Sequence, residues 1–123
     1  MKTIFIVDDN ATNLVTAKTV LEGSYKTYAL PSAARMFQIL EKIFPDLILL
    51  DIEMPETDGF EALSALKANE KYKSIPVIFL SANHDSESES RGLKAGALDF
   101  IVKPFSPPEL IKSIETHLGN ESN

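Results

Sequence analysis

Short apolar runs recur along the chain and are separated by longer segments with helical periodicity. Four runs are continuous, Ile4–Val7, Leu47–Leu50, Val77–Leu80 and Phe100–Val102, whereas Tyr25–Leu30 alternates between apolar and polar residues. Continuous runs are typical of strands that are covered on both faces, and an alternating run is typical of an edge strand. The pattern predicts five strands, with residues 25–30 at an edge of a sheet.

Five segments with apolar residues at helical spacing follow these strands. They cover residues 14–22, 32–43, 60–67, 86–95 and 106–118. The last begins with Ser106-Pro107-Pro108-Glu109, a capping box with proline in the first turn. Five repeats of a strand followed by a helix predict an α/β fold, in which helices cover both faces of a parallel sheet.

Length and charge narrow the class of protein. The chain has 123 residues, the usual size of one domain, and we assign residues 1–119 to that domain and 120–123 to a C-terminal tail or the start of a linker. The net charge of −6 disfavours direct binding to nucleic acid. No segment approaches the roughly 20 apolar residues that span a bilayer, and there is no cysteine. We therefore expect a cytoplasmic protein without membrane contact.

Polar side chains follow four of the predicted strands, at the point where each strand ends. They are Asp8 and Asp9, then Asp51, Ser81 and Lys103. Because the carboxyl ends of parallel strands meet at one edge of a sheet, where open α/β sheets bind ligands, we expect these groups to converge. The alternative is that the acid pair after the first strand merely caps the next helix. It is disfavoured because a neighbouring asparagine or threonine can do so without two charges.

Carboxylates in this arrangement favour a hard divalent cation such as Mg²⁺. The five glycines fit neither G-x-G-x-x-G nor the Walker pattern, so no loop is available to hold a nucleotide. A small phosphoryl group is the better match, because a carboxylate can act as a nucleophile and form an aspartyl phosphate. The lysine and the cation would then stabilise the charge on the transferring oxygens.

Four stretches, FIVDDN, LILLDIEMPETDGFE, VIFLSA and FIVKPF, occur in this order. With their spacing, they resemble the receiver domain of two-component response regulators along essentially the whole chain. The resemblance implies a flavodoxin-like fold with five helices and five parallel strands in the order 2-1-3-4-5. It implies a signal-transduction switch, not a conventional enzyme. The partners would be a sensor histidine kinase or histidine phosphotransfer protein, and an output domain or downstream protein.

The resemblance also implies roles for individual residues. Asp51 would accept the phosphoryl group from a phosphohistidine. The ligands of Mg²⁺, or of Mn²⁺ in its place, would be Asp8, Asp9, Asp51 and the backbone carbonyl of Glu53, with Asp9 binding directly and Asp8 often through water. Lys103 would pair with Asp51 before transfer and with the phosphoryl group afterwards, and Ser81 would donate a hydrogen bond to a phosphoryl oxygen.

Other positions would tune or report the phosphorylated state. Phe100 matches an aromatic residue that turns inward on activation, although a plain packing role is equally consistent with it. Glu53 and Asn83 match variable positions near the mouth of the site that set the phosphoryl lifetime. The Lys103-Pro104 bond matches one that is usually cis in this family. The fourth helix, fifth strand and fifth helix would form the face that reports the switch.

Two alternatives stay open. The first is a phosphohydrolase with an aspartyl nucleophile, in which Glu53 would be the acid two residues after it, although the chain has no cap domain to select a substrate. The second is an adaptor that works without phosphorylation, which the full set of acids, Ser81 and Lys103 disfavours. The stretch KPFSPPELIKSIETHL is similar to receivers that precede cyclic-dinucleotide enzyme domains.

Overall fold

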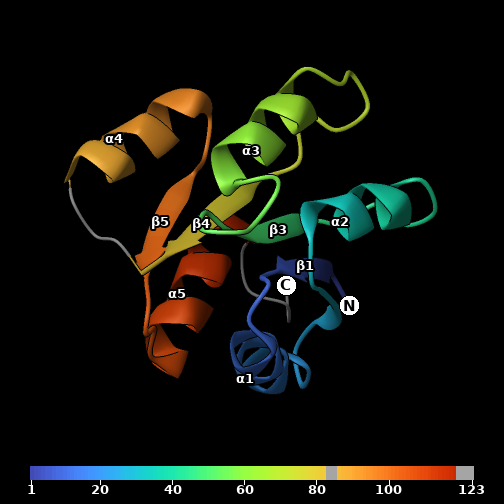
Figure 1. Ribbon diagram of the computed structural model, residues 1–123. Coiled ribbons are helices and arrows are strands. Elements are labelled where there is room, and N and C mark those ends of the chain that lie inside the picture. Colours follow the sequence, from blue (N-terminus) through green and yellow to red (C-terminus); the bar gives the residue numbers. More distant parts are fainter. Residues whose placement is uncertain (83–85, 119–123) are drawn as a thin grey trace.

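The computed structural model describes residues 1–82 and 86–118. Its elements in chain order are β1 Thr3–Val7, α1 Ala11–Leu21, β2 Lys26–Leu30, α2 Ala33–Leu40, β3 Leu47–Asp51, α3 Gly59–Lys67, β4 Val77–Ser81, α4 Ser86–Ala95, β5 Asp99–Val102 and α5 Pro107–Leu118 (Figure 1). All five predicted strands and all five predicted helices are confirmed. The expected tail, 120–123, lies outside the described residues, so the boundary of the domain stays a prediction.

The five strands form one parallel sheet in the order β2-β1-β3-β4-β5. This confirms the predicted fold class and the position of the alternating strand β2 at an edge. The other edge is β5, whose one partner among the described strands is β4. Strand β3 lies in the centre, between β1 and β4, and its last residue, Asp51, is paired with Leu80. The order places the phosphoacceptor candidate on the central strand, which has two strands on each side.

Helices cover both faces of the sheet: α1 and α5 lie on one side, and α2, α3 and α4 lie on the other (Figure 1). Because successive strand residues point to opposite faces, each continuous apolar run contributes to two cores. Ile4, Leu49 and Ile78 pack with α1 and α5, whereas Phe5 and Phe79 pack with α2 and α3. The strands are buried on both faces, as their continuous apolar runs predicted.

Local capping explains where the helices begin. Asn10 caps α1, with its side chain accepting a hydrogen bond from the backbone N–H of Asn13 at 3.0 Å. The predicted capping box of α5 is present: Glu109 N–H donates to Ser106 Oγ, and Ser106 N–H donates to the Glu109 carboxylate. Asp58 and Glu61 form a second capping box at the start of α3. These side chains satisfy backbone donors that have no partner inside a helix.

One helix is shorter than its apolar pattern predicted. Helix α2 ends at Leu40, whereas the helical spacing continues to Ile43. The N–H groups of Lys42 and Ile43 both donate to the carbonyl of Ile39, so the chain tightens into a turn there. Ile43 still packs against the core from this turn. The apolar spacing therefore predicted correctly that Ile43 packs against the core, but it predicted a helix that is too long.

No helix within residues 1–82 and 86–118 combines the length and the apolar character that crossing a membrane requires.

Candidate functional site

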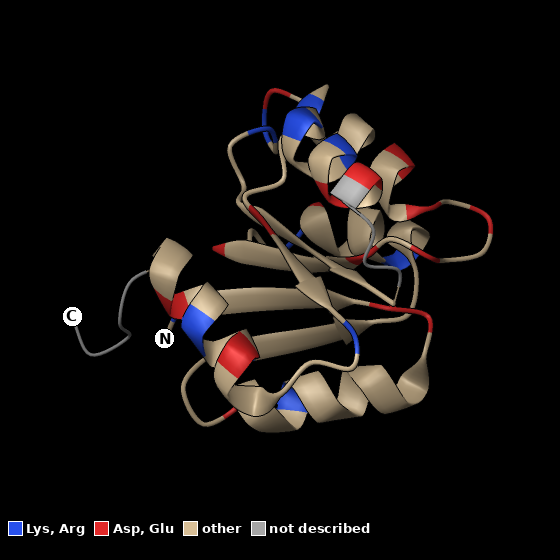
Figure 2. Ribbon diagram, turned by 90° about the vertical axis from the view of Figure 1, so that its left-hand side faces the viewer, with Lys and Arg blue, Asp and Glu red and all other residues tan. Residues whose placement is uncertain are grey.

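The candidate site lies at the carboxyl ends of the strands. Asp51 and Ser81 are the last residues of β3 and β4, and Asp8 directly follows β1. Lys103 follows β5, and its backbone N–H donates to the carbonyl of Ser81 at 2.7 Å. Figure 2 shows acidic segments, in red, in the loops beyond the arrowheads of the strands. The topology brings together the groups that the sequence places after separate strands.

A buried ion cluster forms the centre of the site. Lys103 Nζ lies 2.9 Å from Asp51 Oδ1 and 3.2 Å from Asp8 Oδ2. The Asp51 and Asp8 side chains are 1% and 0% exposed, and that of Lys103 is 13% exposed. Burying charged groups is costly unless each finds a partner. One ammonium group therefore faces two carboxylates, which leaves the cluster with an excess of negative charge.

Burial and the excess of negative charge shift the pKa values of Asp51 and Lys103. Burial raises the pKa of the Asp51 carboxyl from 3.8 to about 7, with Lys103 opposing the shift and Asp8 adding to it. Burial alone would lower the pKa of the Lys103 ammonium, but the adjacent Asp51 and Asp8 carboxylates raise it above its ordinary value of 10.5. Lys103 thus stays charged, and Asp51 is the group whose protonation the site controls.

The acidic cluster fits a divalent cation. One carboxylate oxygen from each of Asp8, Asp9 and Asp51 lies within 4.8 Å of the other two. Neither Asp51 oxygen accepts a hydrogen bond of good geometry from the described residues, although Oδ1 is ion-paired with Lys103. A buried carboxylate with unused lone pairs beside two further acids has the oxygen donors that Mg²⁺ prefers. Asp9 is exposed, so it offers this site an oxygen from the solvent side.

Asp8 also has a local structural role. Its Oδ1 accepts a hydrogen bond from the N–H of Asn10 at 2.9 Å, while Oδ2 faces Lys103. Because the side chain of Asn10 caps α1, the two acids are not needed as caps, and the capping alternative explains neither charge. The bond from Asn10 instead holds the Asp8 carboxylate in place at the end of β1.

An open cavity of about 420 Å³ lies at the mouth of the site. It is lined by Asp9, Asn10, Asn13, Asp51, Glu53, Ala82, Lys103 and Pro104. Two of these, Asn10 and Asn13, are polar residues at the start of α1 that sequence reasoning did not place at the site. Their position follows from the turn that leads from β1 directly into α1. The Lys103-Pro104 peptide bond is cis, as the family resemblance implied.

The side chain of Glu53 spans the gap between two loops at this mouth. Ser81 Oγ donates to Glu53 Oε2 at 2.7 Å, and the N–H of Ala82 donates to Glu53 Oε1 at 2.9 Å. Ser81 itself is buried, and Glu53 is an exposed residue. Sequence reasoning placed Glu53 near the mouth but did not predict this contact, because no motif specifies which way an exposed side chain turns. Asn83, the other predicted lifetime-tuning residue, lies outside the described residues.

Phe100 and Asp99 point to opposite faces of β5. Phe100 is partly buried against the core beneath α2 and α3, and a Cβ atom added to Gly92 of α4 would lie 3.8 Å from its ring.

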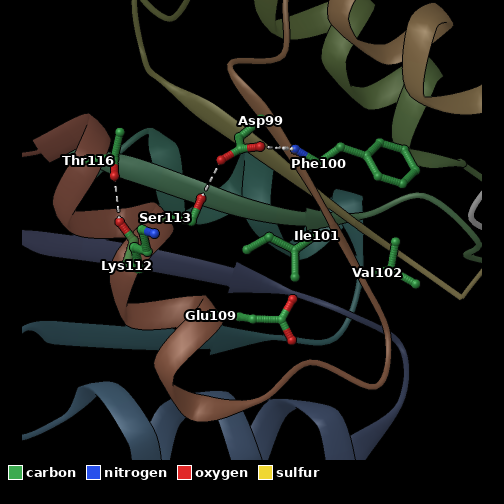
Figure 3. A pocket seen from close by; sticks show the side chains of 8 residues that line it. All are labelled: Asp99, Phe100, Ile101, Val102, Glu109, Lys112, Ser113 and Thr116. Atoms are coloured by element: carbon green, nitrogen blue, oxygen red, sulfur yellow. Dashed lines mark hydrogen bonds between the residues drawn. The ribbon is translucent and has the colours of Figure 1, made fainter. Parts of the chain in front are cut away.

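Figure 3 shows Asp99 on the other side of β5, in a groove between β5 and α5. There the Asp99 carboxylate accepts hydrogen bonds from Ser113 Oγ at 2.7 Å and from the N–H of Phe100 at 2.8 Å. His117 Nε2 lies 3.4 Å from Asp99 Oδ2. This network was not predicted, and it ties α5 to the strand.

Comparisons with known proteins identify the family. The family model for the response regulator receiver domain matches residues 4–115. The polar-differentiation response regulator DivK of Brucella ovis is 35% identical over 120 residues, covering 97% of this chain and 98% of that protein. The chemotaxis protein CheY4 of Vibrio cholerae has a TM-score of 0.90 at 27% identity, covering 96% of this chain and 99% of that one.

A longer relative shows the same kind of match over part of its length. A Vibrio cholerae protein named "Probable cyclic di-GMP phosphodiesterase" is 40% identical over 119 residues, which cover 97% of this chain. The match covers 27% of that relative, so this chain spans about a quarter of its length. The family model, the relatives and the topology agree, and the chain belongs to the response regulator receiver domains of two-component signalling, whose family role is phosphorylation-based switching.

Proposed function

We propose that Asp51 is the phosphoacceptor of this receiver domain and takes its phosphoryl group from a phosphohistidine in a Mg²⁺-dependent reaction. The observation that carries the proposal is the buried Asp51 carboxylate. It lies 2.9 Å from Lys103 Nζ and has acidic oxygens of Asp8 and Asp9 within 4.8 Å. The proposed nucleophile thus lies beside a compensating cation and the acids that would bind a metal, and the cluster borders a cavity.

The transfer is a displacement at phosphorus. An oxygen of the ionised Asp51 carboxylate attacks, a P–O bond forms, and the P–N bond to the donor imidazole breaks. The bonding electron pair leaves with the imidazole nitrogen. Lys103 opposes the effect of burial on the pKa of Asp51, which favours the ionised form that attacks. Once the carboxylate is phosphorylated, Lys103 can pair with the new phosphoryl oxygens. Without Lys103, burial and the Asp8 carboxylate would act on the pKa of Asp51 unopposed.

Asp8, Asp9, Asp51 and the backbone carbonyl of Glu53 would hold the cation, with Mn²⁺ as a substitute for Mg²⁺. When bound, it neutralises charge on the transferring oxygens and orients them. Two donors hold the Asp8 carboxylate in place: the ammonium group of Lys103 donates to Oδ2, and the backbone N–H of Asn10 donates to Oδ1. In the metal-free protein, burial raises the pKa of Asp51, and the Asp8 carboxylate adds to this shift.

Phosphorylation would then change the contacts at the site. The phosphoryl group adds charge and strong acceptor oxygens, and Ser81 and Lys103 would bind them only in that state. Because Lys103 follows β5 and Ser81 ends β4, these contacts act on the strands beside α4 and α5. We propose that the face formed by α4, β5 and α5 reports the change, with Phe100 on the α4 side of that face.

A histidine kinase or histidine phosphotransfer protein is the proposed donor, and an output domain or downstream protein is the proposed recipient of the signal. The long Vibrio cholerae relative suggests a cyclic-dinucleotide enzyme as one class of output. We place the reaction in the cytoplasm, where sensor kinases transfer phosphoryl groups to receivers. Receiver domains are phosphoacceptor switches and not conventional enzymes, so the phosphohydrolase alternative is not retained.

The test is incubation with a small phosphoryl donor and Mg²⁺, followed by intact-mass measurement. The wild type should gain one phosphoryl group, and Asp51→Asn should gain none. Glu56→Gln is the matched control, because Glu56 is an exposed acid in the loop after β3 and lies five residues from the proposed acceptor. It should behave as the wild type. Phosphorylation of Asp51→Asn to the wild-type level would refute the assignment.

A further inference from the structure

The Glu53 side chain occupies two hydrogen-bond donors at the end of β4. One is the hydroxyl of Ser81, at 2.7 Å from Oε2, and the other is the backbone N–H of Ala82, at 2.9 Å from Oε1. Each carboxylate oxygen accepts one bond, so the pair of donors binds the carboxylate group in a bidentate way. Donors that converge in this manner form a small anion site.

This anion site borders the position that a phosphoryl group on Asp51 would take. Leu80, which precedes Ser81, is paired with Asp51 in the sheet, and the N–H of Ile52 donates to the Leu80 carbonyl at 3.0 Å. Asp51, Glu53 and Ala82 line the same cavity. A phosphoryl oxygen projecting into this cavity would approach Ala82, which lines it, and Ser81, which directly precedes Ala82 at the end of β4. These residues carry the two donors that Glu53 already holds.

We propose that Glu53 is a built-in competitor of the phosphoryl group, so that phosphorylation must displace its carboxylate from Ser81 and Ala82. This inference rests on the proposed function of Asp51. The bonds to Glu53 stabilise the unphosphorylated state, and their free energy is subtracted from the gain on phosphorylation. After displacement, the Glu53 carboxylate lies close to a new anion, which adds repulsion of the same sign.

Competition for donors and simple charge repulsion make different predictions for a shorter acid. Glu53→Asp keeps the negative charge but lacks one methylene group, so its carboxylate falls short of Ser81 and Ala82. If Glu53 and the phosphoryl group compete for the Ser81 and Ala82 donors, Glu53→Asp should behave like Glu53→Ala. If only charge matters, it behaves like the wild type. Glu53 is exposed, so these variants are expected to fold, which a thermal melt checks.

The experiment measures binding of beryllium fluoride in the presence of Mg²⁺ by ¹⁹F NMR. This probe attaches to a carboxylate oxygen through beryllium and presents fluorines where phosphoryl oxygens would lie. Glu53→Ala and Glu53→Asp should both bind about tenfold more tightly than the wild type, as expected for the loss of hydrogen bonds to a charged group. Glu56→Gln is the control and should bind as the wild type does.

Hydrogen exchange of the Ala82 amide gives a second measurement that needs no ligand. The amide should be protected in the wild type and lose protection equally in Glu53→Ala and Glu53→Asp. Unchanged probe affinity in Glu53→Ala, or wild-type affinity in Glu53→Asp, would overturn the inference.

Failure of the proposed function looks different. In that case the wild type and Asp51→Asn would bind the probe alike, whatever residue stands at position 53.

Discussion

Lys103 Nζ lies between two buried carboxylates, 2.9 Å from that of Asp51 and 3.2 Å from that of Asp8. Removing this cation leaves two negative charges on carboxylates that are 1% and 0% exposed. We predict that Lys103→Met lowers the free energy of unfolding by about 3 kcal/mol at pH 8, a typical cost of removing one partner from a buried pair. The loss should be smaller at pH 5, where Asp51 is protonated. Urea unfolding at both pH values measures it.

A surface lysine gives the matched control for this variant. Lys73 pairs with Glu70 at 2.9 Å, but both side chains are more than half exposed. Exposed pairs of this kind contribute little, so Lys73→Met should change stability by about 0.5 kcal/mol or less. Equal losses for the two lysine variants would contradict the view that Lys103 neutralises a buried site.

Asp51→Asn should stabilise the metal-free protein at pH 8 while it abolishes phosphorylation. A carboxyl whose pKa is raised by folding contributes most below its unfolded value of 3.8, and the contribution is lost as pH rises through about 7. Asparagine cannot ionise, so the variant escapes this loss. We expect a gain of about 1 kcal/mol or more at pH 8, seen as a rise in Tm. The gain should shrink at pH 4 and vanish if Asp51 has an ordinary pKa.

Mg²⁺ should raise the Tm of the wild type by mass action. At a concentration about 100 times its Kd, a ligand that binds only the folded state adds about 2.7 kcal/mol. Asp9→Asn should lose most of this effect, because Asp9 supplies an exposed carboxylate oxygen to the acidic cluster. Glu70→Gln, remote from the cluster, should respond as the wild type. Thermal melts across a Mg²⁺ titration separate the two.

Ser113→Ala should weaken the attachment of α5 to β5. Burial alone would raise the pKa of Asp99, but hydrogen bonds from Ser113, the Phe100 N–H and His117 lower it below 3.8. A lowered carboxyl pKa stabilises the fold above the unfolded value, and this contribution is lost as pH falls through the folded value. Because the Asp99 side chain is 42% exposed and solvent screens it, we expect a loss of about 0.5 kcal/mol at pH 7 that disappears in strong acid. Unfolding curves at both pH values test this.

Thr116→Val is the control for Ser113→Ala on the same helix. Thr116 Oγ1 donates to the carbonyl of Lys112 within α5 and makes no bond to β5 (Figure 3). Its replacement should leave the acid dependence of unfolding unchanged. A similar acid dependence in both variants would show that the effect does not come from Asp99.

Gly59 leaves no space for a side chain between α3 and the end of β3. A Cβ atom at this position would lie 2.7 Å from both the backbone oxygen of Asp51 and the Cα of Ile52, and backbone atoms cannot move aside cheaply. We predict that Gly59→Ala costs about 2 kcal/mol and slows phosphorylation, because relief of the clash displaces Asp51. Gly23, with nothing within 4 Å of such an atom, is the control: Gly23→Ala should be neutral or slightly stabilising.

Much of this structure could be predicted because the spacing of apolar residues and the residues at strand ends can be read directly from the sequence. Apolar runs predicted the strands, and Asp8, Asp51 and Lys103 could be placed together because strand ends in a parallel sheet share one edge. The contacts of Glu53 with Ser81 and of Asp99 with Ser113 were not foreseen. Each joins an exposed or partly exposed carboxylate to a buried serine, across 28 and 14 residues, and neither hydrophobic period nor capping chemistry specifies such pairs.

Strand order has a mechanical consequence for the two partners at the centre of the site. Asp51 ends β3, which is held by ladders on both sides, whereas Lys103 follows β5, which is held on one side only. Shifting an outer strand breaks one row of backbone bonds, and shifting an inner strand breaks two. The proposed nucleophile thus follows a strand held on both sides and its cation a strand held on one side, so we expect a rearrangement at their contact to shift the β5 edge more than it shifts Asp51.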